Sequence, residues 1–229
     1  MQAVILAGGK GTRLLPYTTV LPKPLMPIGE KPVLEIVLGQ LKHAGFRKII
    51  IAVGYLESLI QAYFGDGRRF GLDITYSIEG KPLGTAGPLG LLDHLEENFL
   101  VMNGDVLANL DLSKLYRKHL RSKAICTVSV FSKSVPITLG VLDVSPKGLV
   151  TKYTEKPTLK YDVSMGIYIF NRRIQDFIPR NKHLDLPELI TTLIRKKETV
   201  QTFAFRGEWL DIGRPEDYEV AQREAHKFV

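Results

Sequence analysis

The sequence has almost no cysteine and no long run of apolar residues. Its lone Cys126 excludes a disulfide framework and a zinc site built from cysteines, and it suits a reducing, cytoplasmic compartment. Every apolar run falls short of the ~20 residues that a membrane-spanning helix needs, so no membrane partner is expected. The apolar start covers only residues 3–7 and lacks the features of a secretory signal, which favours a buried first strand.

Charge is plentiful but scattered. The chain of 229 residues carries 31 Lys and Arg against 24 Asp and Glu, a formal net charge of +7. A nucleic-acid-binding domain would gather its basic residues in a stripe with aromatic side chains among them. Here several basic residues stand singly in loops rich in glycine and proline, which suits small anionic ligands better. No nucleic-acid partner is expected, and a steep salt dependence of nucleic-acid binding would be the sign of one.

The first half of the chain alternates between short apolar runs and helical patterns. Lys48–Val53, for example, has the continuous apolar core that is typical of a strand buried in a parallel sheet. This alternation predicts an α/β fold with a doubly wound, mostly parallel, Rossmann-like sheet and right-handed crossovers. The expected strands are Gln2–Ala7, Lys48–Val53, Asp73–Ile78 and residues 99–103, and the expected helices are residues 34–41, 56–64 and 88–97.

From residue 124 onward the pattern becomes rich in β-strands, which predicts a mixed sheet with an antiparallel insert. Strands are expected over residues 125–131, 139–144, 149–153, 163–170 and 199–205, with a hairpin turn at residues 145–148. Asp111 and Asp185 are interpreted as caps that open helices, and Pro215 as the start of a final helix. The chain has no repeat or linker, so residues 1–229 are expected to form one domain.

A glycine loop follows the first expected strand, in the segment LAGGKGTRLLPYTTVLPKPL at residues 6–25. Gly8, Gly9 and Gly11 would let backbone amides approach a ligand, while Arg13 and Lys23 supply positive charge. The spacing differs from that of a P-loop and of a dinucleotide fingerprint, both of which need glycine where this loop has other residues. The segment is therefore predicted to hold phosphate in a different type of loop.

Two aspartates stand where a metal ion could be held. Asp105 ends the apolar run FLVMNGD, and Asp211 lies in WLDIG. Magnesium is usually bound by one or two carboxylates together with substrate phosphates, so these two would suffice. The five histidines show no spacing typical of a nucleophile or a metal site, and no role is assigned to them.

These motifs resemble those of the sugar-1-phosphate nucleotidylyltransferases, which join a nucleoside triphosphate to a sugar 1-phosphate and release pyrophosphate. The resemblance extends in order over nearly the whole chain and is closest to the mannose-1-phosphate and heptose-1-phosphate guanylyltransferases. It implies a Mg²⁺ cofactor, a nucleotide-binding half over about residues 1–123, a sugar-phosphate-binding half over about residues 124–229, and it leaves a homodimer open. The left-handed β-helix that ends some family members is expected to be absent.

The resemblance also implies roles for individual residues. Arg13 and Lys23 would be catalytic, and Asp105 and Asp211 would bind the metal. The nucleotide would contact Leu6, Ala7, Gly8, Gly9, Gly11, Thr12, Glu79, Pro82, Gly84, Thr85 and Gly104, and the sugar phosphate Gly140, Glu155, Lys156, Ser164 and Gly166.

The base and the sugar are the open questions. A carboxylate at Glu79 can accept two parallel hydrogen bonds from guanine, whereas uracil or thymine offers one donor, so the sequence favours GTP over UTP or dTTP. Ser164 stands where the family commonly has Asn at a sugar contact, which indicates a non-standard sugar. Arg214 stands where the family often has Thr, which changes the surroundings of Asp211 but leaves this expected metal ligand in place. A catalytically silent sensor or regulatory subunit that binds a sugar nucleotide is the alternative from another class.

Overall fold

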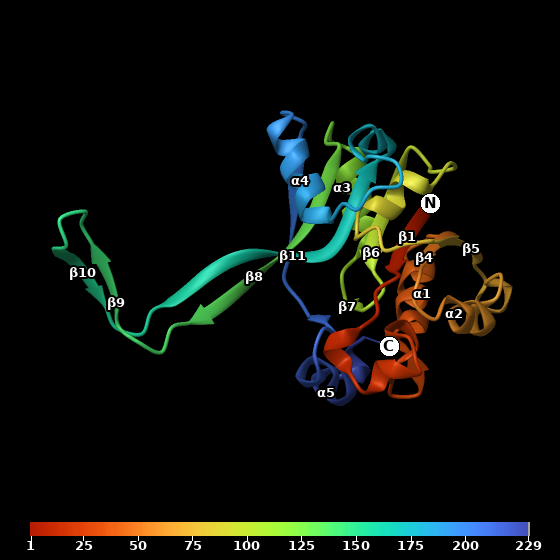
Figure 1. The fold of residues 1–229 in the computed structure, drawn as a ribbon, viewed down its shortest axis with the longest axis horizontal. Helices are drawn as coiled ribbons and strands as arrows, with labels where there is room; N and C mark the ends of the chain where they lie inside the picture. The colour runs from red at the N-terminus through yellow and green to blue at the C-terminus, as the bar shows by residue number, and fades with distance from the viewer. Residues whose placement is uncertain (229) are drawn as a thin grey trace.

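A computed structural model describes residues 1–228. Seven strands of this chain form one central sheet (Figure 1). The strand order is β12-β8-β11-β6-β1-β4-β5. Strands β6, β1, β4 and β5 run parallel, β11 is antiparallel to both β6 and β8, and β12 is parallel to β8. The bounds are β1 Gln2–Ala7, β4 Lys48–Val53, β5 Asp73–Ile78, β6 Asn98–Asn103, β8 Cys126–Pro136, β11 Thr158–Asn171 and β12 Val200–Phe205.

Helices cover both faces of this sheet because its strands are apolar on both sides. In β1, Ala3 and Ile5 face one buried cluster, which includes α1, whereas Val4 faces a second cluster, which includes α4. The predicted doubly wound, mostly parallel class is therefore confirmed, and so are the cap at Asp111 and the capping box at Asp185. The helices are α1 Val33–His43, α2 Glu57–Phe64, α3 Leu112–Leu120, α4 Leu186–Arg195 and α5 Pro215–Arg223.

Short elements position the loops around the carboxyl ends of the parallel strands. An antiparallel ribbon of β7 (Val106–Ala108) and β13 (Trp209–Asp211) brings the C-terminal part of the chain beside the end of β6. Strands β2 (Pro27–Ile28) and β3 (Lys31–Pro32) pair with each other and directly precede α1 in the sequence. The short 3-10 helices are Thr12–Leu14, Tyr17–Thr19, Lys23–Leu25, Arg68–Phe70, Gly87–Leu91, Arg172–Phe177 and Ala225–Lys227.

The helix predicted over residues 88–97 is wrong, because this segment contains only the short 3-10 helix Gly87–Leu91. Gly90 lies so close to Ile178 that a Cβ on it would be 2.9 Å from the Ile178 Cγ2 atom. Gln175 donates hydrogen bonds to the carbonyls of Leu89 and Leu92, at 2.9 and 2.7 Å. Tertiary contacts thus satisfy carbonyls that a longer helix would have used internally.

Strands β8 and β11 are longer than predicted and continue beyond the sheet as a two-stranded ribbon (Figure 1). Beyond the ribbon, β9 (Val141–Val144) and β10 (Val150–Thr154) form a hairpin whose turn lies at residues 145–148, as predicted. We call residues 131–163 the β-arm; in Figure 1 it projects away from the body of the molecule. Among residues 1–228, no helix combines the length and apolar character that crossing a membrane requires.

Candidate functional site

A cavity of about 440 Å³ lies at the carboxyl ends of the parallel strands. In an open α/β sheet this is where ligands are usually bound. Every residue predicted for the nucleotide lines the cavity, and so do Arg13, Lys23 and Asp105. Segments far apart in the sequence therefore meet in one place. The lining residues that sequence reasoning missed are Pro24, Pro88, Asn103, His183 and Gly213.

The loop after β1 needs its glycines because neighbouring segments approach the backbone closely. A Cβ on Gly8 would be 2.6 Å from Glu79 Oε1. Gly11 has a left-handed backbone with φ of 63°, and a Cβ there would be 2.9 Å from Thr18 Cγ2. The Thr18 hydroxyl donates to the Gly11 carbonyl at 2.8 Å and fixes this conformation. Packing as well as ligand access thus explains these glycines.

Lys23 and Asp105 form a largely buried ion pair at the floor of the cavity, with side chains 11% and 22% exposed. Within residues 1–228, no hydrogen bond reaches the buried Oδ1 atom of Asp105. A buried carboxylate oxygen without a partner is uncommon, because its lost hydration is not replaced. One carboxylate oxygen of Asp105 is therefore left without a partner among the described residues.

Asp211 lies beside Asp105 because β13 pairs with β7. The Ile212 amide donates to the Asp105 carbonyl at 3.0 Å, next to the Asp211↔Val106 pair. Partial loss of hydration, followed by the negative charge of Asp105, raises the pKa of Asp211 above its usual value. These neighbouring carboxylates are the oxygen donors at the cavity that could hold a divalent cation.

Arg13 adds a second positive charge on the same side of the cavity. A Cβ on Gly213 would be 3.4 Å from Arg13 Nη1, so the guanidinium lies against this glycine. The Gly213 amide donates to the Asp211 carbonyl at 2.8 Å, which holds that turn. The positive charges of Lys23 and Arg13 both act to lower the pKa of Asp211. Arg13, Lys23 and Asp105 therefore line the cavity together, and Asp211 lies close enough for all three charges to act on it.

Glu79 follows the edge strand β5 and lines the cavity. Its Oε2 atom accepts a hydrogen bond from the Leu83 amide at 2.9 Å, and its own amide donates to the Val53 carbonyl at 3.0 Å. Burial raises the pKa of Glu79 above its usual value, against the lowering effects of the Leu83 amide and His183. Oε1 faces Gly8, so one carboxylate oxygen is held by the chain while the other lies at the cavity wall.

The loop at residues 82–87 is fastened to the start of α4. The Thr85 amide donates to Asp185 Oδ1 at 2.9 Å, and the Thr85 hydroxyl accepts from the Leu186 amide at 2.8 Å. Gly84 has φ of 77°, and a Cβ there would be 2.6 Å from the Leu184 carbonyl oxygen. Thr85 thus lines the cavity with its hydroxyl engaged in a structural contact. The same fastening brings His183 to the cavity, which no local sequence signal could indicate.

The residues predicted for the sugar phosphate lie in two separate places. Ser164 and Gly166 are at the base of the β-arm, where a Cβ on Gly166 would be 2.8 Å from Asn103 Nδ2. Gly140, Glu155 and Lys156 are on the β-arm itself, whose hairpin projects away from the body in Figure 1. None of these five residues lines the cavity, but Gly166 lies against Asn103, which does.

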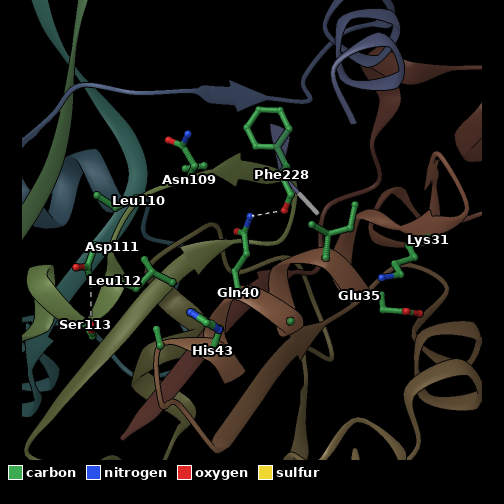
Figure 2. A pocket seen from close by; sticks show the side chains of 14 residues that line it. Lys31, Glu35, Gln40, His43, Asn109, Leu110, Asp111, Leu112, Ser113 and Phe228 are labelled. Atoms are coloured by element: carbon green, nitrogen blue, oxygen red, sulfur yellow. Dashed lines mark hydrogen bonds between the residues drawn. The ribbon is translucent and has the colours of Figure 1, made fainter. Parts of the chain in front are cut away.

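Figure 2 shows a larger cavity, of about 620 Å³, between α1 and the segment that leads into α3. None of the residues predicted for the site lines it. Its Asp111 accepts from the Lys114 amide at 2.7 Å as the cap of α3, and this bond lowers the pKa of that carboxyl. Gln40 donates to the Phe228 carbonyl at 3.0 Å across the cavity. Asp111 and Gln40 are thus engaged in structural roles, and the smaller cavity, which the predicted residues line, is the candidate site.

Comparisons with known proteins show what this chain is similar to. The sequence profile of the family described as "Nucleotidyl transferase" matches residues 2–227. A UTP–glucose-1-phosphate uridylyltransferase from Synechocystis is 37% identical over 245 residues, covering 97% of this chain but 63% of that protein. The chain thus spans less than two thirds of that relative.

Other relatives match over the full length. A D-glycero-alpha-D-manno-heptose 1-phosphate guanylyltransferase from Aneurinibacillus thermoaerophilus is 32% identical over 234 residues, covering 100% of both chains. A solved structure from Bacillus anthracis, of a protein assigned as a glucose-1-phosphate thymidylyltransferase, superimposes with a TM-score of 0.83 at 25% identity. That match covers 100% of this chain and 96% of the other.

Proposed function

The chain belongs to the nucleotidyl transferase family, and from this premise we propose that it transfers a nucleoside monophosphate from a nucleoside triphosphate to a sugar 1-phosphate. The observation that carries the proposal is the cavity itself. It combines a glycine loop, the cations Arg13 and Lys23 and the carboxylate Asp105 at the carboxyl ends of parallel strands, and Asp211 lies beside Asp105. This arrangement suits an anionic substrate whose reaction depends on charge neutralisation.

The chemistry needs few protein groups. A phosphomonoester has its second pKa at about 6, so the sugar phosphate is largely dianionic at neutral pH. Its oxygen attacks the α-phosphorus and forms a P–O bond there, while the bond from that phosphorus to the β-phosphate bridge breaks and pyrophosphate leaves. The attacking oxygen carries no proton, so no general base is required. Arg13 and Lys23 would orient the phosphates and neutralise their charge.

The carboxylates fit a magnesium ion. Asp105 Oδ1 is buried without a partner among residues 1–228, and the charge of Asp105 contributes to raising the pKa of Asp211. A divalent cation would satisfy the oxygen and relieve the repulsion between the two groups. We propose that Asp105 and Asp211 hold Mg²⁺, which when bound would neutralise phosphate charge. Lys23 would keep Asp105 oriented, since the two side chains are paired.

GTP is the triphosphate that we propose, on the basis of Glu79. Its carboxylate at the cavity wall can accept from both the N1–H and the N2–H₂ groups of guanine, and a full-length relative is named as a guanylyltransferase. UTP is the second candidate, because a relative with higher identity is named as a uridylyltransferase. A base with a single donor would make only one of the two hydrogen bonds that the Glu79 carboxylate can accept.

The test is pyrophosphate release across a grid of GTP, UTP, dTTP and ATP against several sugar 1-phosphates, with millimolar Mg²⁺ or with a chelator. We expect turnover only with Mg²⁺ and the highest kcat/KM with GTP. A preference for UTP would overturn the guanylyl assignment alone, whereas no turnover with any pair would overturn the activity. Binding of a GDP-sugar without turnover would instead support the silent sensor.

Asp105→Asn tests the metal role within the same assay. We expect kcat/KM to fall roughly a hundredfold or more, because the substitution removes a charged oxygen donor while keeping the shape of the side chain. The matched control is Asp73→Asn, an exposed aspartate at the start of β5 outside the cavity. Equal activities of Asp105→Asn and the control would contradict a metal-binding role for Asp105.

A further inference from the structure

The β-arm is amphipathic along its whole length. In its ribbon, the cross-strand pairs Leu159↔Val135, Tyr161↔Lys133 and Val163↔Phe131 lie on one face, where Lys133 is the single charged residue. The pairs Lys160↔Ser134 and Asp162↔Ser132 lie on the other face. In its hairpin, the pairs Val150↔Val144 and Tyr153↔Leu142 share a face, opposite the pair Lys152↔Asp143. Such alternation is typical of a sheet with one face buried and one face in water.

The apolar face of the β-arm is nevertheless exposed. Leu142 is 48% exposed, Tyr153 62% and Tyr161 53%. A two-stranded ribbon is at best marginally stable in water when nothing covers its apolar face. Exposed apolar side chains gathered on one face of a strand pair favour a contact with another molecule.

We propose that a second copy of this chain covers the apolar face of the β-arm. In a two-fold dimer, each copy lays its β-arm against the partner's body and delivers Glu155 and Lys156 to the partner's cavity. The inference rests on the proposed function in so far as these residues complete a sugar-phosphate site. A two-fold exchange is closed because each copy gives one arm and receives one. The exchange therefore involves two copies and does not extend to further ones.

The arm is held in its extended direction. Strands β8 and β11 continue from the central sheet into the arm, from the pair Phe170↔Cys126 to the pair Thr158↔Pro136, with a single register shift. At the base, Phe131 packs on Trp209 with ring centroids 5.4 Å apart, and Trp209 Nε1 donates to the Met165 carbonyl at 3.1 Å. Folding the arm back onto its own cavity would break these contacts or bend the ladder. A partner can receive the arm without either change.

The junction between the hairpin and the ribbon of the arm, where β10 is followed by β11, carries a preformed polar cluster. The Tyr153 hydroxyl donates to Glu155 Oε2 at 2.8 Å, and Lys156 Nζ lies 3.8 Å from Glu155 Oε1. Gly140 lies against Tyr153, where a side chain would not fit. Lys156 has φ of 43°, a left-handed backbone that costs a residue other than glycine about 1–2 kcal/mol. Strain of this kind is typical of functional positions, yet in its own chain the cluster faces solvent.

Charge favours a second copy as the occupant. The arm is basic, with Lys133, Lys147, Lys152, Lys156 and Lys160 against Asp143, Glu155 and Asp162. Helix α5, which borders the cavity, presents an acidic first turn with Glu216 and Asp217. A Cβ on Gly213 would be 3.6 Å from Asp217 Oδ2, which places this acidic turn at the cavity edge. A basic arm from a partner therefore meets acidic surface beside the site.

Complementation between two inactive variants tests the exchange. Asp105→Asn and Lys156→Ala chains, co-expressed with different affinity tags, are purified as heterodimers by tandem capture. If arms are exchanged, one of the two sites joins an intact body to an intact arm, so about half of the wild-type activity returns. If each arm serves its own chain, every site contains one defect and no activity returns. Full activity of the Lys156→Ala homodimer, or failure to capture any heterodimer, also overturns the proposal.

Sedimentation analysis separates this inference from the proposed function. Leu142→Ser with Leu159→Ser on the apolar face should convert the dimer to monomer at micromolar concentration. The matched control, Asp143→Ser with Lys160→Ser on the polar face, should leave it dimeric. Even if no substrate pair is turned over, and the proposed function fails, this pattern supports the exchange. A wild-type monomer, or a dimer insensitive to both double variants, overturns it.

Discussion

Replacing Glu79 by Gln changes the base-facing wall of the cavity in a way that the structure defines. Oε2 of Glu79 already accepts a hydrogen bond from the Leu83 amide at 2.9 Å. In the variant, the amide oxygen must take that place, because an NH₂ group there would oppose another donor. The NH₂ group then occupies the position of Oε1 beside Gly8. The variant presents donors where guanine also presents donors.

The size of the effect follows from the hydrogen bonds lost. A hydrogen bond to a charged group contributes about 1.5–3 kcal/mol, and one to a neutral group about 1 kcal/mol. In the variant, guanine loses the bond to the Oε1 position, and its second bond goes to a neutral oxygen, so the total loss is about 3 kcal/mol. This corresponds to roughly a hundredfold in kcat/KM for GTP. A uracil or thymine base would lose only one such bond, or roughly tenfold. The ratio of kcat/KM for GTP to that for UTP should therefore fall about tenfold.

The assay is steady-state pyrophosphate release with GTP and with UTP at a fixed sugar 1-phosphate. Glu30→Gln, at an exposed glutamate outside the cavity, is the matched control and should leave both values unchanged. Stability should hardly change, since burial already disfavours the charged form of Glu79. A GTP to UTP ratio that stays the same in Glu79→Gln would refute the role of Glu79 in selecting the base.

Three further predictions test the site and its scaffold. Asp211→Asn should raise the Mg²⁺ concentration needed for half-maximal turnover at least about tenfold, measured by metal titration, because one of two carboxylate donors loses its charge. Gly84→Ala should lower the free energy of unfolding by about 2 kcal/mol or more, because φ at Gly84 is 77° and the Leu184 carbonyl blocks the new Cβ. The control Gly80→Ala has open space around its new Cβ and should leave the free energy of unfolding unchanged. Denaturant melts of the two variants make the comparison. Burial lowers the pKa of His119 from 6.5 to about 4, so on acidification this histidine binds a proton in the unfolded state before it does so in the folded state. The free energy of unfolding should therefore fall by up to about 3 kcal/mol as the pH drops from 6.5 to about 4. Denaturation measured across this pH range should show the slope in the wild type and a flatter one in His119→Asn.

Most residues that line the cavity could be predicted from the sequence because their signals are local. The glycine loop follows β1 directly, and Asp105 follows β6 after one glycine. Carboxyl ends of parallel strands meet at one edge of a sheet, so predicting the strands was enough to bring these residues together. Capping signals at Asp111 and Asp185 were predictable for the same reason, since a cap is defined within a few residues.

Contacts between distant segments could not be predicted in this way. His183 lines the cavity only because Asp185 accepts from Thr85. The segment after Gly87 fails to form a long helix because Gln175 takes up two of its carbonyls. In both cases the hydrogen-bonding partner lies about a hundred residues away in the sequence, on another element of the fold. The periodicity of a single segment cannot indicate such a partner.

The β-arm shows why the sugar side is harder to infer than the nucleotide side. Periodicity located most of its strands, yet the direction of a ribbon depends on the ladder between β8 and β11 and on the packing of Phe131 against Trp209. Residues such as Glu155 are close in sequence to the base of the arm but, in this chain, are carried away from the cavity. If a partner receives the arm, the site is a property of two copies. Sugar selection would then be set where Ser164 and Asn103 of one chain meet the arm of the other, a place that a single sequence describes only in halves.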